Sequence, residues 1–341
     1  MRSDPLASSF NEVFMKRISF LLLGSLVFTA CQNTSSLDQV LSQTYVHKYG
    51  FETTEKDWEE RERDGLVVSV LKNGVKVSQS YENGKLHGST TFTFPHSAII
   101  ERTQVYGQGI LLKDQLNDSA GMPIREEIYE FDNRVLVTLW DEKGVPLSIE
   151  EYDGELLTEG KYYTADHELE ASVISGMGER VKRDRSGLLI SKDQIQNGVM
   201  SCRTTHHPNG GVHTISHYNN YELHGAQMKY TASGRPLMEL NWKNGVLDGP
   251  KIVYRNGLRV AVIPYQDGKK QGTEFHYDDL GNLTAEIEWL EDQKHGITKL
   301  HSEEETESEW FFKGQSVSAD KFRTLETRDQ IASELRDHEI R

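Results

Sequence analysis

Short stretches of alternating apolar and polar residues recur along most of the chain. In residues 283–289, for example, Leu, Ala, Ile and Trp alternate with Thr, Glu and Glu, so the two kinds of side chain would face opposite sides of a strand. Many such stretches are separated by Asn-Gly or Asp-Gly pairs, which accept the positive φ angles that tight hairpins need. The pattern predicts an all-β chain of short antiparallel hairpins.

The hairpins are predicted to repeat every 23 or 24 residues over residues 45–314, in about twelve units. A glycine recurs at this spacing, an aromatic or apolar residue follows it by eight positions, and a second glycine comes seven positions later. The repeat glycines, all assigned to turns, are Gly74, Gly88, Gly210, Gly225, Gly234, Gly249, Gly257, Gly272, Gly281 and Gly296. The aromatic column includes Trp58, Tyr81, Tyr106, Tyr129, Tyr152, Tyr218, Trp242, Tyr265 and Trp289. An irregular unit is expected at residues 165–185, where a charge run replaces the pattern.

Several units carry a more specific motif. The segments Tyr81-Glu-Asn-Gly-Lys-Leu-His-Gly88, Trp242-Lys-Asn-Gly-Val-Leu-Asp-Gly249 and Tyr265-Gln-Asp-Gly-Lys-Lys-Gln-Gly272 resemble the bacterial variant of the MORN repeat. The resemblance covers most of residues 45–314, and it is weakest at residues 98–144. It implies that each unit is a β-hairpin and that successive hairpins stack into one elongated, twisted sheet. A meander of this kind is stabilised by contacts between neighbouring units.

Two shorter segments flank the repeats. Residues 32–44 are polar and rich in Ser and Gln, and they are predicted to be a tether. Residues 315–341 are predicted to form a helical cap that protects the open end of the sheet. Ser318 would be its N-cap, and its apolar side would consist of Phe322, Leu325, Ile331 and Leu335.

The N-terminal residues 1–31 are interpreted as a targeting segment. The cations Lys16 and Arg17 precede the apolar run 18–28, which is too short to cross a bilayer but suits a secretory signal. Translation is expected to start at Met15, because the acidic residues before it do not suit a signal peptide. Phe-Thr-Ala-Cys at residues 28–31 resembles a bacterial lipobox, which implies cleavage before Cys31 and acylation of its thiol. Plain secretion is the alternative.

The net charge of the chain limits the classes of molecule that it can bind. There are 53 acidic and 38 basic side chains, for a net charge of −15. So acidic a protein repels phosphate backbones, which argues against nucleic-acid binding. The acidic runs 52–64 and 303–309 are interpreted as solvated surface or linker, with steering towards a basic partner as the alternative. Membrane contact is assigned to the lipid on Cys31, with an outer-membrane location if the source has two membranes.

The residues around Cys202 are the candidates for catalysis or metal binding among the repeats. Cys202 replaces a repeat glycine, and four histidines at positions 206, 207, 213 and 217 follow it. Their spacing does not match a structural zinc site, and no orienting group for a Cys–His nucleophile is evident nearby. The sequence therefore predicts no enzyme, no metal and no cofactor.

The resulting hypothesis is a lipid-anchored scaffold of the bacterial envelope that binds an unidentified protein partner or self-associates. The resemblance to MORN-repeat proteins supports this hypothesis, because proteins of that family serve as assembly scaffolds. An antitoxin or immunity role, in which the acidic protein neutralises a basic toxin, is the alternative. A hydrolase of the envelope is a third hypothesis, which no catalytic motif in the sequence supports.

Overall fold

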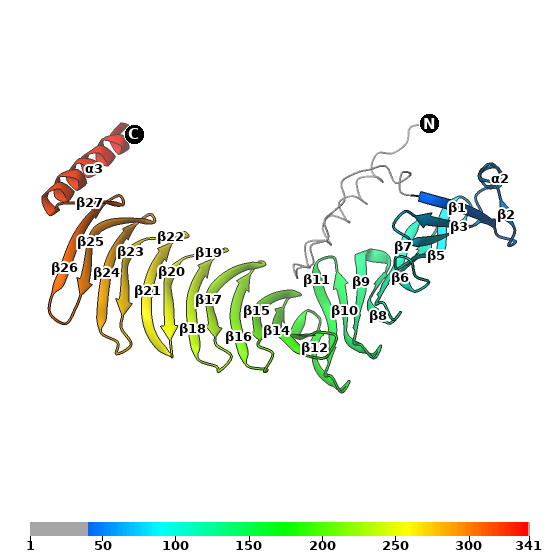
Figure 1. Ribbon diagram of the computed structural model, residues 1–341, viewed down its shortest axis with the longest axis horizontal. Coiled ribbons are helices and arrows are strands. Elements are labelled where there is room, and N and C mark those ends of the chain that lie inside the picture. Colours follow the sequence, from blue (N-terminus) through cyan, green and yellow to red (C-terminus); the bar gives the residue numbers. More distant parts are fainter. Residues whose placement is uncertain (1–39, 340–341) are drawn as a thin grey trace.

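The computed structural model describes residues 40–339 as one open antiparallel β-sheet with a helix near each end (Figure 1). The full-length strands follow one another in chain order, and each pairs with its neighbours in the sequence. The predicted all-β meander with a C-terminal helix is therefore confirmed. Figure 1 also shows the strands upright from β14 to β26 but lying across the view in β1 and β3, so the sheet is strongly twisted.

The first half of the sheet contains β1 (Val40–His47), β2 (Glu52–Thr53), β3 (Gly65–Leu71), β4 (Lys76–Glu82), β5 (Lys85–Thr93), β6 (Ile100–Gly107), β7 (Ile110–Asn117), β8 (Pro123–Tyr129), β9 (Arg134–Trp140), β10 (Pro146–Asp153), β11 (Leu156–Tyr163) and β12 (Leu169–Ile174). The second half contains β13 (Met177–Arg183), β14 (Leu189–Gln196), β15 (Val199–His206), β16 (Val212–Asn219), β17 (Glu222–Tyr230), β18 (Pro236–Lys243), β19 (Val246–Leu247), β20 (Gly249–Arg255), β21 (Leu258–Gln266), β22 (Lys269–Lys270), β23 (Gly272–Tyr277), β24 (Leu283–Leu290), β25 (Gln293–His301), β26 (Thr306–Phe312) and β27 (Gln315–Val317). The helices are α2 (Glu55–Glu60), the 3₁₀ turn η2 (Phe131–Asn133) and α3 (Ala319–Glu339).

The two repeat glycines have different roles, which corrects the assignment of all ten to turns. Gly74, Gly210, Gly234, Gly257 and Gly281 do lie in the turns between strands. Gly88, Gly225, Gly249, Gly272 and Gly296 instead lie within or at the start of a strand, with positive φ. Three of them, Gly88, Gly225 and Gly296, lie where the pairing register shifts, as in a β-bulge.

Each in-strand glycine faces an aromatic residue of the next strand, as in the pairs Gly225–Trp242 and Gly272–Trp289. At some of these positions a side chain would clash with its neighbours, and Gly296 is the clearest case. A Cβ at Gly296 would lie 1.8 Å from the Glu288 carboxylate, which accepts a hydrogen bond from the Ile297 N–H at 2.9 Å. The in-strand glycines therefore supply the positive φ that bulges need, and at Gly296 also the space taken by the Glu288 carboxylate.

The sheet bends sharply between β11 and β14, where the sequence predicts an irregular unit (Figure 1). Strands β12 and β13 pair only at Val173–Gly178 and Ile174–Met177, although their neighbours pair along most of their length. The main apolar core fills this bend. It consists of Leu157, Tyr162, Val173, Val181 and Ile195, none more than 3% exposed.

The N-terminal end departs from the sequence predictions in two ways. The predicted tether 32–44 is too long, because residues 40–44 belong to β1 and pair with β3; residues 32–39 lie outside the described residues. Trp58 belongs to α2 rather than to a strand. Its ring is 4% exposed and lies 5.8 Å from Tyr45 and 6.1 Å from Tyr81, so the acidic run 52–64 folds back as a cover rather than a linker.

The C-terminal cap is partly as predicted. The Ser318 hydroxyl accepts a hydrogen bond from the Lys321 N–H, as an N-cap does, but residues 315–317 form β27. Phe322 packs against Trp310 and Phe312, with ring centroids 5.0 and 6.2 Å apart. Ile331 and Leu335 are 53% and 62% exposed, which corrects the predicted continuous apolar side. Only the first turns of α3 lie on the sheet (Figure 1).

Replacing Phe322 by Ala should therefore release α3 from the sheet. The change removes the ring that joins α3 to β26, and we expect a local loss of about 1–3 kcal/mol. Hydrogen exchange of the β26 amides measures it. Ile331→Ala is the matched control, since that side chain is exposed; faster exchange in β26 on this second change would contradict the proposed docking mode.

Candidate functional site

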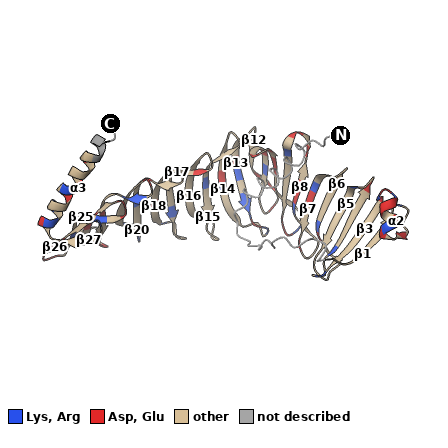
Figure 2. Ribbon diagram, turned by 90° about the horizontal axis from the view of Figure 1, so that it is seen from above, with Lys and Arg blue, Asp and Glu red and all other residues tan. Residues whose placement is uncertain are grey.

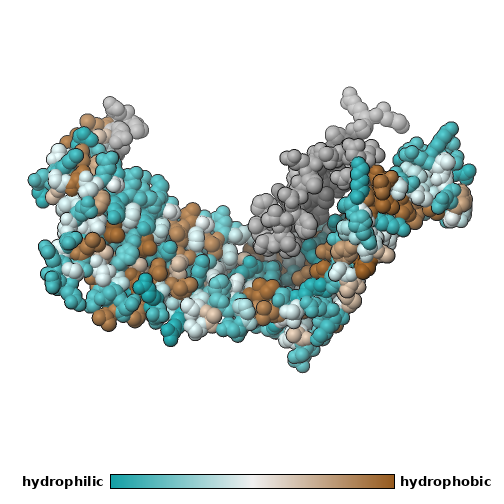
Figure 3. All heavy atoms as spheres, in the orientation of Figure 1, coloured by the Kyte–Doolittle hydropathy of each residue, from teal (hydrophilic) through white to brown (hydrophobic). Residues whose placement is uncertain are grey.

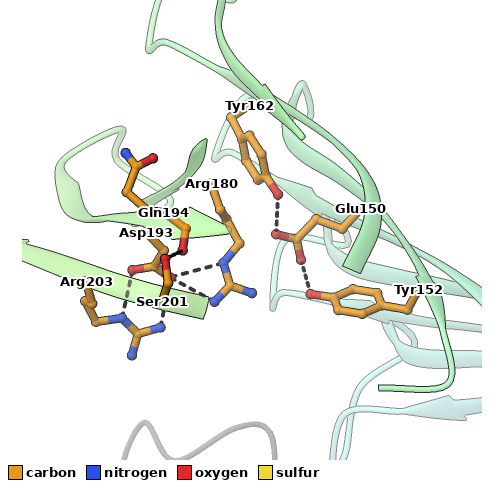
Figure 4. Close-up of polar contacts among 8 residues, drawn as sticks. All are labelled: Glu150, Tyr152, Tyr162, Arg180, Asp193, Gln194, Ser201 and Arg203. Carbon is orange, nitrogen blue, oxygen red and sulfur yellow. Dashed lines mark hydrogen bonds and ion pairs between the residues drawn. The ribbon is translucent and has the colours of Figure 1, made fainter. Parts of the chain in front are cut away.

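The strongest concentration of buried charge lies at the bend. Asp193 of β14 is fully buried and lies between Arg180 of β13 and Arg203 of β15 (Figure 4). Arg180 donates to Asp193 from Nε at 3.1 Å and from Nη2 at 2.8 Å. Arg203 donates from Nε and Nη2 at 2.8 and 2.9 Å. The antiparallel register places the three residues opposite one another on one face of the sheet, so the contacts follow from strand pairing.

A second carboxylate lies on the other side of Arg180. Glu150 of β10 accepts hydrogen bonds from the Tyr152 hydroxyl at 2.6 Å and the Tyr162 hydroxyl at 3.0 Å (Figure 4). Glu150 is 8% exposed and Tyr162 1%. Both tyrosines take part in the packing of the apolar core, so the polar network and that core are one structural unit.

The electrostatics follow from burial and pairing. Burial alone would raise the pKa of Asp193, but hydrogen bonds from Arg203 and the charge of Arg180 outweigh it and lower that pKa. Burial, followed by the negative charge of Glu150, raises the pKa of Tyr152 and of Tyr162 well above the ordinary value. Both phenols are therefore neutral at physiological pH and act as hydrogen-bond donors.

Lys182 of β13 is the unusual member of this group. Burial and then repulsion from Arg180 lower its pKa from 10.5 to about 8, against the attraction of Glu150 and Asp193. No carboxylate within the described residues forms an ion pair with its ammonium group. The protein therefore holds this lysine in a position that disfavours its charged form.

Lys182→Met should stabilise the protein at pH 7, because the folded state then no longer holds a desolvated ammonium group. A lysine whose pKa is lowered on folding binds its proton less well when folded, so stability rises as pH increases from about 8 towards 10.5. We expect a gain of about 1–3 kcal/mol at pH 7 that shrinks by roughly half or more at pH 9.5. Denaturation of both proteins at the two pH values measures it. Lys161→Met, at an exposed position of β11, is the control; a gain at Lys182 independent of pH would disprove the cause.

The network is suited to holding strands together rather than to chemistry. Both Asp193 oxygens are occupied by arginine N–H groups, and both Glu150 oxygens by phenols, so none is directed at open space. Over residues 40–339 no cluster of three or more His, Cys, Asp or Glu side chains has the geometry to hold a metal ion. The shallow depression of about 440 Å³ beside Tyr254 lies far along the sheet, in the turns of β17–β21.

The strand register places one of the four nearby histidines, His217, opposite Cys202. Burial and then the charge of Asp193 raise the pKa of the Cys202 thiol, which makes it a poorer nucleophile. His217 lies opposite it but bonds through Nδ1 to the Ala226 carbonyl at 2.8 Å. His207 and His213 instead pack together, with ring centroids 4.4 Å apart. The histidines near Cys202 in sequence therefore do not converge on its thiol.

The other sequence-predicted site residue, Cys31, lies outside the described residues. The residues of the charge network were not predicted as a site. A signal for them was present, because Arg180, Asp193 and Arg203 are charged residues at positions that should face inward in the strand pattern.

Neither helix within residues 40–339 is long and apolar enough to cross a bilayer.

No family model matches the sequence, and no curated protein matches it. Among solved structures, a porin-like protein from Bacteroides uniformis is similar over 75% of this chain and 89% of that chain, at 10% sequence identity and a TM-score of 0.14. A similarity at that TM-score carries no information about the fold, function or location of this protein.

Proposed function

We propose that this protein is a non-catalytic, protein-binding scaffold of the bacterial envelope, anchored by a lipid on Cys31. One observation carries the scaffold role. Within residues 40–339 the sheet is a single layer, and helices contact it only at its two ends (Figure 1). A single-layer sheet of this length leaves most of both faces open to a partner.

The open faces carry apolar side chains that a partner could bury. On the face opposite the aromatic column, neighbouring strands align Ile215, Met228, Ile252, Val262 and Phe275, with Glu239 between the second and third. These side chains are half-buried, with no covering layer among the described residues. Figure 3 likewise shows brown apolar residues distributed along the visible face of the sheet rather than hidden within it. Exposed apolar surface of this kind commonly marks interaction sites.

The charge distribution favours a protein partner over a lipid surface. Acidic residues outnumber basic ones, and Figure 2 shows red acidic residues on α2 at the N-terminal end. Such a protein is repelled by anionic head groups, so membrane attachment is better explained by acylation of Cys31. In bacterial lipoproteins an Asp after the cysteine tends to retain the protein in the inner membrane, and this chain has Gln32 there, so we favour the outer membrane if the source has two membranes.

The scaffold role is tested by cross-linking intact cells that make the full-length protein. We expect a defined cross-linked partner or oligomer, and its yield should fall with Ile252→Ser/Phe275→Ser, which makes the apolar row polar. Leu280→Ser is the matched control, because Leu280 is 87% exposed in a turn away from that row. If the wild-type protein is correctly folded and still gives no reproducible cross-link, the scaffold role is ruled out.

The anchor is tested separately by labelling cells with a radioactive fatty acid. The wild-type protein should incorporate the label and fractionate with membranes, whereas Cys31→Ser should do neither. Cys202→Ser should behave as wild type. A labelled Cys31→Ser protein, or an unlabelled wild type, would disprove lipidation at this residue.

A further inference from the structure

A group of exposed apolar side chains lies on the hairpin turns at the bend. Residues of this kind normally occur singly on a soluble surface. Here four of the hairpin turns along one margin of the sheet, those of β8–β9, β10–β11, β12–β13 and β16–β17, carry or directly flank such residues, and the β12–β13 turn has two. These residues are Phe131 (85% exposed), Leu156 (44%), Ile174 (63%), Met177 (52%) and Tyr221 (50%), which we call the turn cluster.

Backbone hydrogen bonds hold these turns against one another. Gly154 N–H donates to the Asn133 carbonyl at 3.2 Å, which joins the turn of Phe131 to that of Leu156. Gly176 N–H donates to Thr158 at 2.8 Å, and Gly198 N–H to Gly176 at 2.9 Å. The turns of Phe131, Leu156, Ile174 and Met177 are thus set on a fixed backbone frame.

Further contacts close the group. The Asn197 N–H lies 3.4 Å from the Met177 sulfur, and a Cβ at Gly198 would lie 2.9 Å from Leu156 Cβ. Tyr221 is near Glu155, whose charge, after burial, contributes to raising the pKa of that tyrosine. Residues from turns far apart in sequence are therefore neighbours at the bend.

Tyr221 occupies its position at a cost to the fold. It is the second residue of a two-residue turn and has φ of +68°, which is strained for a bulky side chain. Comparable turns place glycine there, as in Asn83-Gly84, Asn197-Gly198 and Asn244-Gly245. Tyr221 makes up no part of the apolar core. A strained, half-exposed aromatic residue where glycine would fit better indicates a role other than folding.

The margin of the turn cluster is acidic. Exposed carboxylates of Asp132, Asp153, Glu155 and Glu159 belong to the same turns or adjoin them. The nearby cation Arg134 is already engaged by Glu130 and Glu151. The surface therefore combines an apolar centre with an uncompensated negative border.

We propose that the turn cluster docks a basic, amphipathic segment of a partner protein. The apolar side of that segment would cover Phe131, Ile174, Met177 and Tyr221, and its Lys or Arg residues would lie over the acidic border. An apolar centre supplies most of the affinity in such interfaces, and a charged rim supplies orientation and association rate. The inference deepens the proposed scaffold function by assigning the chemistry of the partner and the place where it binds.

The test uses full-length protein in phosphatidylcholine nanodiscs, with binding to empty nanodiscs subtracted. The probe is a fluorescent helical peptide of about 14 residues composed of Leu and Lys, and its counterpart contains Leu and Glu. We expect the Leu/Lys peptide to bind at least roughly tenfold more tightly than the Leu/Glu peptide. Its affinity should fall as NaCl rises from about 0.1 to about 0.5 M, because the rim charges are screened.

Tyr221→Gly is the decisive variant, because it should weaken Leu/Lys binding roughly tenfold while leaving the melting temperature equal to or above that of the wild type. Phe131→Ser should weaken binding similarly, and Leu280→Ser should not change it. Equal binding of the peptide to Tyr221→Gly and wild type would overturn the proposal. So would loss, in Tyr221→Gly, of binding to anionic vesicles or of self-association, since either would make a membrane or a second copy the occupant. If these peptide results fail while cross-linking through the Ile252–Phe275 row persists, the scaffold function stands and the docking site is wrong.

Discussion

Replacing Asp193 by Ala is expected to destabilise the bend by about 3–5 kcal/mol, because it removes the carboxylate shared by Arg180 and Arg203. Arg180 is only 9% exposed, and Lys182 nearby already carries a disfavoured positive charge. Arg180 and Lys182 would then have Glu150 as their main negative neighbour, and Arg203 would lose its carboxylate partner. The loss should exceed that of a simple cavity, since unpaired buried charge is added to it.

The measurement must be local, because long repeat arrays do not unfold in one step. Hydrogen exchange should show loss of protection in β10–β15 first, with β23–β26 retaining theirs. Asp279→Ala is the matched control, because its ion pair with Arg255 is highly exposed on both sides and should contribute less than about 0.5 kcal/mol. Uniform loss along the whole sheet after Asp193→Ala would show that the bend is not an independent unit.

The second large effect is expected from Gly178→Ala. Gly178 has φ of +145°, and a Cβ there would lie 2.1 Å from the Ser172 carbonyl oxygen and 3.0 Å from Val173 Cα. Both obstacles are backbone atoms, so no side-chain rotation relieves the clash. Gly178 also forms one of the two register pairs that join β12 to β13. We expect a loss of at least about 3 kcal/mol and separation of the two halves of the sheet.

Chemical denaturation followed by small-angle scattering tests this prediction, since separated halves would change the overall dimensions before strand content is lost. Gly281→Ala provides the comparison. Its φ is +87°, but a Cβ there meets no atom within 4 Å, so only the conformational cost of about 1 kcal/mol remains. Equal effects of the two substitutions would show that the clash at Gly178 is relieved elsewhere.

Much of the fold could be predicted from local sequence alone. Alternation in residues 283–289 and turn pairs such as Asn244-Gly245 specify strands and tight turns without reference to distant residues. Consecutive strands pair with their neighbours, so strand order follows directly. The assignment of Gly225 and Gly296 to turns was wrong because glycine is used for both turns and bulges, and only the pairing register distinguishes them.

Predictions were least successful where contacts cross several units. Trp58 matches the aromatic column by spacing, yet it lies on α2, where its ring packs against Tyr45 of β1 and Tyr81 of β4. Ile331 and Leu335 match a helical apolar side, but α3 extends beyond the sheet and leaves them without a surface to cover. Spacing identifies which residues share a side of an element, not whether anything lies against that side.

The sequence by itself determined a repeated hairpin, its turns and the order of its strands, since each depends on residues at most about two dozen positions apart. Only the tertiary structure decided where the sheet bends, which charges are buried at the bend, and which turns meet to form the turn cluster. Those features arise because β12 and β13 diverge after two register pairs. Asp118 and Arg185 then form an ion pair at 2.9 Å across 67 residues of sequence, a contact that no local pattern encodes.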